Sequence, residues 1–380
     1  MSIGTEKISA KQLFCLMFLF ELGSAIVVGI GMQAKQDAWL AVLIGMLNGI
    51  PLFLIYVYLF YQFQGLSLTS YLPKILGKAI GLPLSYIYIL YFLYISSRVL
   101  RDFGDLLITS TLDLTPLYVV NGLMIALVAY GVYSGIEVIG KTAEMVFILM
   151  VTLGFLTYFF TLISGLVKLE NLSPILENGW KPILSTVYKQ TYTFPFGEMI
   201  VFTMFLPYLN KPHLGKKAGI YAIFSTGMIL SLTIAIEISI LGVLGVSESQ
   251  FPLLETITKV NIANFIQRVD VIVVATLIFG VFIKIMVFFY AGLAGIVDIF
   301  HISKNKHRIF CILLLSIFIL VYSIKMASSF TEHIEVGLKW VPLYLHLPLQ
   351  TGVPGLLFVI TLIRKSLTKN KLGANEAGRV

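Results

Sequence analysis

Ten long apolar segments dominate this chain, and they limit what it can fold into more than any other feature. Each has roughly the 20 residues that an α-helix needs to cross the hydrocarbon core of a bilayer. Because a bilayer offers the backbone no hydrogen bonds, such segments cross it as helices. The expected spans are 11–34, 38–62, 82–108, 116–134, 141–165, 186–209, 217–245, 268–300, 308–324 and 338–363.

The scarcity of charged side chains supports the same interpretation. Only 12% of the residues are charged and the mean hydropathy is +0.93, whereas a soluble domain carries roughly 25% charged residues. So few charges cannot cover a globular surface in water, so most of the surface is expected to contact lipid. The net charge of +8 comes from short basic clusters between the apolar segments. That distribution argues against nucleic acid as a partner.

The basic residues between the spans predict the orientation of the chain. With ten spans both termini lie on one side, and the connections on that side hold 16 Lys and Arg residues against 8 on the other. An excess of Lys and Arg marks the cytoplasmic side, so both termini are expected in the cytoplasm. We expect residues 1–368 to form one transmembrane domain and the polar residues 369–380 to be a disordered cytoplasmic tail.

Two of the expected spans, 11–34 and 186–209, contain helix-breaking residues near their middle. Gly23 permits non-helical dihedral angles in the first span, and Gly197 does so in the second. Pro195 lacks a backbone donor and clashes with the preceding turn. A broken helix is tolerated at membrane depth only where it lines a cavity or is buried in protein. Both segments are therefore expected to face the interior of the bundle.

The positions of the two breaks in the chain are as informative as the breaks themselves. They open two halves with five spans each, about 8–165 and 186–363. Matched interruptions are typical of transporters built from inverted repeats, whose substrate site lies between the broken helices near the bilayer midplane. The alternative is a pair of packing kinks stabilised by contacts between small residues. The matched positions favour the transporter.

Charged residues also lie near the middle of the expected spans, among them Glu21, Glu198 and Lys284. A charge at that depth costs at least about 2.5–3.5 kcal/mol unless it is paired or hydrated. Lys284 is therefore expected to pair with Glu21 or Glu198, as a structural or functional counter-ion. The alternative is a lysine that extends to the membrane surface. Glu237 carries the same cost and has no evident partner in the sequence.

Four charged residues in span 82–108 share one helical face, because Arg98, Arg101, Asp102 and Asp105 are spaced i, i+3, i+4, i+7. This spacing predicts the pairs Arg98–Asp102 and Arg101–Asp105. The face must point into the bundle or an outer vestibule. Two roles stay open: an ion-pair network that fixes the helix, or a gate and a contact to the carboxylate of a ligand.

No pattern indicates an enzyme, a metal site or a cofactor. Cys15 and Cys311 lie in separate apolar segments, as buried free thiols do, and the five histidines lack metal-ligand spacing. A P-loop and a nucleophile elbow are also absent from the sequence. We expect neither a metal nor a cofactor, and no catalytic residue.

Several runs of sequence resemble a known family. Residues 8–31, 37–39, 179–209 and 251–292 are similar to the signature regions of the B subunits of GerA-type germinant receptors, which are relatives of the amino acid–polyamine–organocation permeases. The resemblance covers nearly the whole chain. It implies an all-α integral membrane protein of about ten helices with a LeuT-like fold, in which five helices are followed by an inverted repeat of five. The first helix of each repeat is broken.

The same resemblance implies a function and partners. A B subunit of this kind binds a small nutrient germinant, usually an amino acid, and triggers germination from the inner membrane of the spore. It lies in the lipid beside an A-type subunit and a C-type lipoprotein subunit. The alternative is a proton-coupled or uncoupled amino acid permease, which would use the same pocket.

The resemblance also places the pocket between the two broken helices, with the third and eighth helices as walls. Many permeases have Gly-x-Gly in the first break, whereas Ala25 follows Gly23 and Ser24 here. Fewer exposed amides are therefore expected for binding a carboxylate. Lys284 is placed to take the role of a coupling cation, which would remove the need for sodium. The implied pocket residues are Gly23, Ser24, Tyr91, Ile95, Phe194, Pro195, Phe196, Gly197, Lys284 and Phe288.

Overall fold

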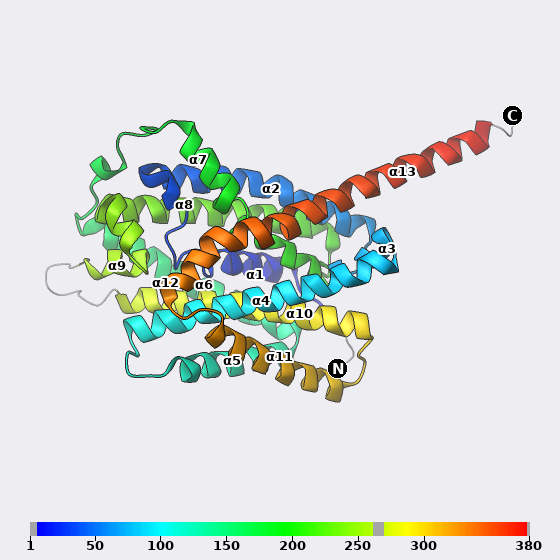
Figure 1. Ribbon diagram of the computed structural model, residues 1–380, viewed down its shortest axis with the longest axis horizontal. Helices are drawn as coiled ribbons and strands as arrows, with labels where there is room; N and C mark the ends of the chain where they lie inside the picture. The colour runs from blue at the N-terminus through cyan, green and yellow to red at the C-terminus, as the bar shows by residue number, and fades with distance from the viewer. Residues whose placement is uncertain (1–5, 261–269, 378–380) are drawn as a thin grey trace.

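The computed structural model describes residues 6–260 and 270–377, and this part of the chain is helical apart from its connections (Figure 1). Its α-helices are α1 (Ala10–Leu22), α2 (Ala38–Gln62), α3 (Leu68–Leu76), α4 (Lys78–Ser110), α5 (Leu117–Ser134), α6 (Ile136–Ile163), α7 (Trp180–Thr186), α8 (Gly215–Glu248), α9 (Pro252–Thr258), α10 (Asp270–Phe300), α11 (Asn305–Lys325), α12 (Phe330–Glu335) and α13 (Val353–Ala377). Shorter 3-10 and π-helical turns join them: η1 (Met32–Asp37), η2 (Leu169–Leu172), η3 (Val187–Thr191), η4 (Phe196–Met204), η5 (Leu206–Tyr208), η6 (Pro212–Leu214), η7 (Val336–Trp340) and η8 (Pro342–Gly352).

Eight helical stretches of the described chain are long and apolar enough to cross a membrane. They coincide with eight of the ten expected spans and contain α2, α4, α5, α6, α8, α10, α11 and the η8–α13 stretch. The two remaining spans, 11–34 and 186–209, fall short because each is interrupted at its middle. The chain is therefore a multi-pass membrane protein in which two of the predicted crossings are broken helices.

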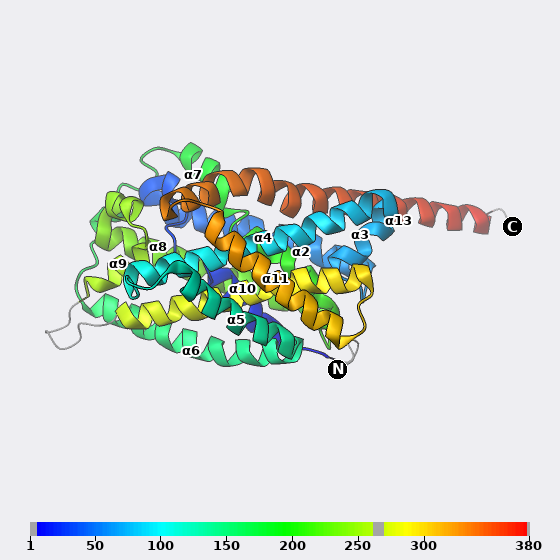
Figure 2. The same ribbon diagram turned by 60° about the horizontal axis from the view of Figure 1, so that its bottom comes forward.

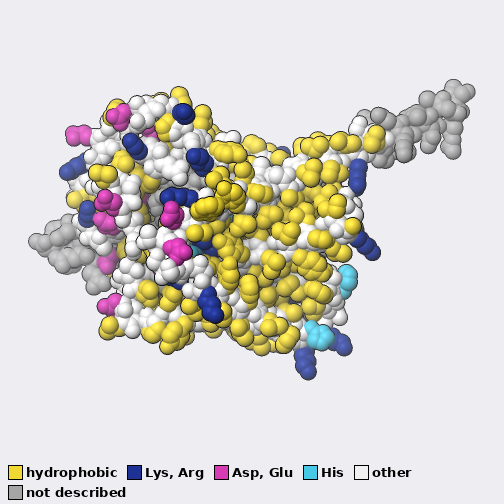
Figure 3. Space-filling view, viewed as in Figure 1, with side chains coloured by type: hydrophobic (Ala, Val, Ile, Leu, Met, Phe, Trp, Pro, Cys, Tyr) yellow, Lys and Arg dark blue, Asp and Glu magenta, His cyan; other side chains and the backbone are white. Residues whose placement is uncertain are grey.

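The long helices lie side by side along the length of the molecule (Figures 1 and 2). α7 and α9 lie at one end, and α3 and both termini lie at the other. Figure 3 shows a broad hydrophobic surface on this face, with most acidic side chains gathered at the end that carries α7 and α9. This distribution fits a bundle whose middle is surrounded by lipid and whose ends reach water.

The first break follows a well-capped helix. The Ser9 hydroxyl accepts a hydrogen bond from the Gln12 amide (3.1 Å), and the Gln12 side chain accepts one from the Ser9 amide (2.9 Å), which together form a capping box at the start of α1. The helix ends at Gly23, where the backbone is not helical (φ −7°, ψ −105°). Helical structure returns only at Met32. The break predicted at Gly23 is confirmed.

The second break lies between η3 and η4. The chain leaves the helix after Thr191 and resumes as η4 at Phe196. Pro195 has no amide hydrogen to continue the preceding turn, and its carbonyl accepts the Glu198 amide at 3.0 Å to begin the next. The two broken segments pack together, with the rings of Phe20 and Phe202 edge to face at 5.2 Å. This break is also confirmed.

The last helix, α13, extends to Ala377. The expected domain boundary at 368 and the cytoplasmic tail stay predictions. The short helix α3, between α2 and α4, was not predicted. The connection between α6 and α7 contains η2, and the one between α8 and α10 contains α9, while 261–269 lies outside the described residues.

Candidate functional site

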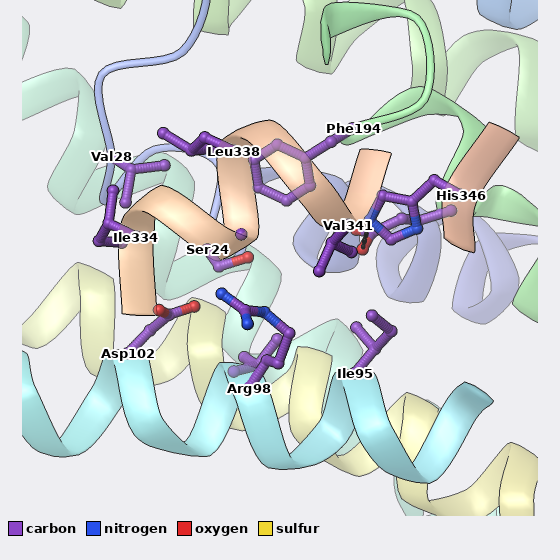
Figure 4. Close-up of a pocket in the computed structure, with 13 residues that line it drawn as sticks. Ser24, Val28, Ile95, Arg98, Asp102, Phe194, Ile334, Leu338, Val341 and His346 are labelled. Atoms are coloured by element: carbon purple, nitrogen blue, oxygen red, sulfur yellow. Dashed lines mark ion pairs between the residues drawn. The ribbon is translucent and has the colours of Figure 1, made fainter. Parts of the chain in front are cut away.

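A small cavity lies at the centre of the bundle, where the two breaks meet α4 and the η7–η8 stretch (Figure 4). Its volume is about 40 Å³, which is room for a few water molecules. Five polar residues line it: Ser24, Arg98, Asp102, Glu198 and His346. The rest of the wall consists of Val28, Ile95, Val99, Phe194, Ile334, Gly337, Leu338 and Val341.

Lys284 and Glu198 form a buried ion pair next to this cavity. The Lys284 Nζ lies 2.5 Å from Oε2 of Glu198, and both residues are at most 1% exposed. The ammonium also lies over the rings of Phe20 and Phe194, 5.0 and 4.8 Å from their centroids, where cation–π attraction adds to the pairing. A lysine that extends to the membrane surface is therefore excluded, and Glu198 is the partner.

Glu21, the other candidate partner, is held by α8 instead. The Thr226 hydroxyl donates a hydrogen bond to its Oε2. Within the described residues its Oε1 has no partner. Both carboxylates lie at similar depth in their spans, so the sequence could not separate them. The packing of α1 against α8 decides which of the two glutamates pairs with Lys284.

A hydrogen-bonded network links α4 to η8 beside the ion pair. The Tyr91 hydroxyl lies 2.7 Å from Nδ1 of His346, and the Gln350 amide donates to the Tyr91 oxygen at 2.8 Å. The same Gln350 amide nitrogen lies 2.9 Å from Nδ1 and can only donate, so Nδ1 is the acceptor. The remaining ring proton is therefore assigned to Nε2, which lies 3.8 Å from Oε1 of Glu198. His346 thus presents an N–H group to the cavity.

The two glycines of the breaks allow close packing. A Cβ added to Gly23 would lie 2.8 Å from Cδ of Lys284, and one added to Gly197 would overlap the side-chain oxygen of Gln350. Gly23 therefore makes room for the stem of Lys284. Gly197 makes room for the amide that orients Tyr91 and His346. Neither glycine is part of the cavity wall. Each allows a side chain next to the wall to pack closely.

The charged face of α4 is only partly paired as expected. The Arg101–Asp105 pair is present, with Nε 2.6 Å from Oδ2. The predicted Arg98–Asp102 pair is wrong. Arg98 donates instead to the backbone carbonyl of His333 (2.6 Å), and Asp102 contacts Nε2 of the same residue (2.7 Å). The physical reason is that α12 folds over α4 and brings a fully buried histidine between the two side chains.

The first break leaves backbone donors unused. The Gly23 amide donates to Leu19 and the Ile26 amide to Leu22, both at 2.9 Å. In the described part of the chain the amides of Ser24 and Ala25 donate to no acceptor. Ala25, in place of a glycine, therefore still leaves these two backbone amides without an acceptor. Together with Arg98, they are the groups near the cavity that suit an anionic ligand group.

Different contacts lie towards the two ends of the molecule. On the side of α9 a vestibule of about 340 Å³ shares Val28, Ile334 and Leu338 with the cavity, so these apolar residues separate the two. On the side of the termini the N-terminal segment pairs with the end of the second broken span. The Ile8 amide donates to Tyr208 at 2.9 Å, and the Ile8 carbonyl accepts from Asn210 at 3.0 Å.

Comparison with known sequences identifies the family. The sequence profile described as spore germination protein matches residues 7–331 of the 380. The chain belongs to the spore germination protein family. It is 39% identical to spore germination protein KB of Bacillus subtilis (strain 168) over 97% of this chain and 98% of that protein. It is 25% identical to spore germination protein YndE of the same organism over 78% of this chain and 82% of that protein.

Two solved structures that are similar to this chain have a transporter fold. Mhp1, a nucleobase-cation-symport-1 family transporter in a closed conformation with bromovinylhydantoin bound, matches with a TM-score of 0.71 at 12% identity, over 93% of this chain and 78% of that one. MhsT in complex with L-phenylalanine matches with a TM-score of 0.68 at 14% identity, over 93% and 88%. The predicted family and the LeuT-like fold are confirmed.

The residues that the resemblance placed in the pocket form two layers in this spore germination protein. Ser24, Ile95 and Phe194 line the cavity, with Arg98, Asp102 and Glu198 from the predicted buried charges. The second layer consists of Gly23, Tyr91, Pro195, Phe196, Gly197, Lys284 and Phe288, which the cavity wall does not include. Which of them a ligand contacts stays a prediction.

Sequence reasoning missed three residues that matter to the site: His333, His346 and Gln350. The signal for two of them was present, since His346 and Gln350 are polar, spaced i, i+4, and lie in the apolar span 338–363. His333 precedes that span and carries no such signal. Only the fold of α12 over α4 brings it to Arg98 and Asp102.

Proposed function

We propose that this protein is the B-type subunit of a nutrient germinant receptor and that it binds a small germinant, an amino acid, in the central cavity. The observation that carries the proposal is a buried cavity with groups of both charges at the meeting point of the two breaks. The name of the 39% identical relative supports a role in germination. The L-phenylalanine bound to MhsT, which has the same fold, supports an amino acid as ligand.

The chemistry of the wall favours a zwitterion. Arg98 and the unpaired amides of Ser24 and Ala25 suit a carboxylate, and Asp102 suits an ammonium group. Apolar side chains such as Ile95 and Phe194 surround these groups. A cavity of about 40 Å³ must enlarge to admit an amino acid. Binding would therefore move the walls, which is what a sensor needs.

Lys284 supports binding that does not depend on sodium. Its ammonium lies beside the first break, and its stem packs against Gly23. We propose that this fixed charge takes the role of a coupling cation. The proposal includes an A-type subunit and a C-type lipoprotein as partners in the spore inner membrane, with both termini of this chain in the cytoplasm.

The decisive experiment measures thermal stabilisation of the purified full-length protein across amino acids, sugars and nucleosides. An amino acid that stabilises the protein should be compared with the amine that lacks its carboxylate. We expect stabilisation by the amino acid alone, and loss of that preference in Arg98→Gln. Arg101→Gln is the matched control, because it breaks a buried ion pair that does not line the cavity. Stabilisation by sugars only, with no change in Arg98→Gln, would contradict the proposal that the ligand is an amino acid.

The alternative function is an amino acid permease, proton-coupled or uncoupled. The transporter fold favours it, because folds of this kind carry out alternating access around a central site. Uptake of the stabilising amino acid into proteoliposomes separates the two functions. A receptor binds without accumulation inside the vesicle. A permease accumulates the amino acid, and a pH gradient increases the accumulation only when protons are coupled.

A further inference from the structure

Another cavity, of about 310 Å³, lies beside the first break. Leu22 and Ile26, which stand on either side of the break, form part of its wall. Met150 of α6 belongs to the same wall, and its Cε lies 3.5 Å from a Cβ added to Gly280, which in turn would lie 3.3 Å from Cα of Gly23. The remaining wall residues come from α1, α6, α8, α9 and α10. The site described above makes no use of this space.

The wall of this cavity offers nothing to a polar ligand. Among the described residues none of its side chains is charged, and its three hydroxyl groups already donate within the protein. The Thr157 and Thr276 hydroxyls each donate to the carbonyl one turn earlier in their own helix, at 2.9 Å. The Tyr158 hydroxyl donates to Thr233 at 2.6 Å, because the Thr233 proton is used on the Ile229 carbonyl. A water molecule in a cavity needs two to four polar partners, so the cavity suits an apolar occupant.

The cavity opens towards lipid near the middle of the membrane. Val151, Phe155 and Leu232 line it and are also 46–68% exposed on the outer surface of α6 and α8. These residues lie near the middle of two helices that are long enough to cross a membrane. Phe18 and Met150 belong to the same wall but are only 4% exposed. At the depth of the opening the surrounding medium consists of acyl chains, so these chains are what meets the cavity.

An acyl chain gains contacts when it enters this cavity. Side chains around an empty space lose their dispersion contacts on that side, and a chain that enters restores them. The chain loses no hydrophobic stabilisation in the exchange, because lipid tails and apolar side chains are equally apolar. The size also fits, because an apolar cavity of about 150 Å³ already binds benzene, and this one has about twice that volume.

We propose that this cavity binds the end of an acyl chain of a membrane phospholipid. The bound chain contacts Leu22 and Ile26, and so packs against both sides of the first break. A lipid therefore completes the packing of the broken helix on the side of α6 and α8. This inference does not depend on a ligand in the central cavity, so its failure would leave the proposed function untouched.

Photo-cross-linking in vesicles tests the proposal. The full-length protein is reconstituted in phosphatidylglycerol vesicles that contain a phosphatidylglycerol with a diazirine near the end of one acyl chain. Mass spectrometry then identifies the labelled residues. We expect cross-links to Phe18 and Met150, which bulk lipid does not reach, and to Ile317 of α11, which is 61% exposed and serves as the reference. Labelling of Ile317 without labelling of Phe18 and Met150 would overturn the proposal.

Gly154→Phe is designed to fill the cavity. Gly154 lines it, and no atom lies within 4 Å of its added Cβ, so a ring has room there. The variant should lose the cross-links to Phe18 and Met150 and keep those to Ile317. Gly122→Phe on α5 is the matched control, because its added Cβ also meets no atom within 4 Å and it lies outside this wall. Unchanged cross-links in Gly154→Phe would count against the cavity; if that variant does not fold, the wild-type pattern decides.

A photoreactive alkane without a headgroup distinguishes a lipid from a free apolar molecule. It is added to the same vesicles in place of the photoreactive phospholipid. Labelling of Phe18 and Met150 by the phospholipid supports the acyl chain of a membrane lipid as the occupant. Labelling by the alkane alone would assign the cavity to a small apolar molecule and would overturn the proposal.

Discussion

Lys284 and Glu198 depend on each other inside the membrane. The ion pair is 2.5 Å long, and neither residue is exposed by more than 1%. Removing one member of a buried pair leaves the other charge without compensation and typically costs about 3–5 kcal/mol. We expect Lys284→Met, which keeps most of the stem, to lower the free energy of unfolding by that amount. Thermal or denaturant unfolding of the purified protein measures it.

Three variants distinguish this explanation from a general effect on folding. Adding Glu198→Gln to Lys284→Met should recover part of the stability, whereas adding Glu21→Gln should not, because Glu21 contacts Thr226. Lys339→Met removes a surface ion pair with Glu335, in which both side chains are more than half exposed, and should have little effect. Wild-type stability in Lys284→Met would contradict the buried pair.

A substitution at Gly197 tests how closely the site is packed. Any Cβ at this position overlaps the side-chain oxygen of Gln350. The nitrogen of the same amide group contacts Tyr91 and His346, so a shift of Gln350 would disturb both. Gly197→Leu should therefore abolish stabilisation by the ligand while leaving protein abundance in the membrane largely intact. Gly122→Leu on α5 is the matched control, because no atom lies within 4 Å of its added Cβ. A normal ligand response in Gly197→Leu would remove the second break from the site.

At the scale of single elements, α12 acts as a cover for the site. It lies against α4 through His333, which contacts Asp102 through its ring and Arg98 through its carbonyl. Its Phe330 ring lies 5.0 Å from the ring of Phe251, the residue before α9. The adjoining residues Ile334 and Leu338 separate the vestibule from the cavity. Release of α12 should therefore open the cavity to the vestibule.

His333→Ala measures the strength of this cover. The variant loses a hydrogen bond to a carboxylate, which contributes about 1.5–3 kcal/mol, so the open state should become at least about tenfold more populated. Labelling of Ser24→Cys by a thiol reagent should accelerate by the same factor. Glu332→Ala is the control on the same helix, since its carboxylate accepts hydrogen bonds from the amide and hydroxyl of Ser328 and, among the described residues, from no other group. Equal rates in the two variants would show that α12 does not close the site.

For the whole molecule, the distribution of charge predicts the orientation. Both termini lie at one end, opposite α7 and α9 (Figures 1 and 2). The excess of basic residues predicts that this end lies in the cytoplasm. A cysteine at Glu170 should react with an impermeant reagent from outside in a chain that lacks Cys311, and a cysteine at Lys365 should react only after permeabilisation. Both positions are exposed. The reverse pattern would overturn the orientation.

The sequence by itself determined the class of fold and the positions of the two breaks. Ten apolar segments require helices because lipid cannot satisfy the backbone, and Gly23 with Pro195 and Gly197 marks where two of them must break. Intramembrane charges mark the interior of the bundle, because a charge facing lipid is too costly. These features depend only on residue type and local spacing. They were sufficient to predict the broken helices and the neighbourhood of Lys284.

Tertiary structure alone decided which groups meet. The choice of Glu198 over Glu21 for Lys284, and of His333 over Arg98 for Asp102, depends on how distant helices are placed. Tyr91 and His346 are separated by 255 residues, yet their side chains form a hydrogen bond. Spacing within a helix fixes its faces to within a fraction of a turn, but partner choice depends on ångström-scale distances between helices. The packing of the whole bundle sets those distances.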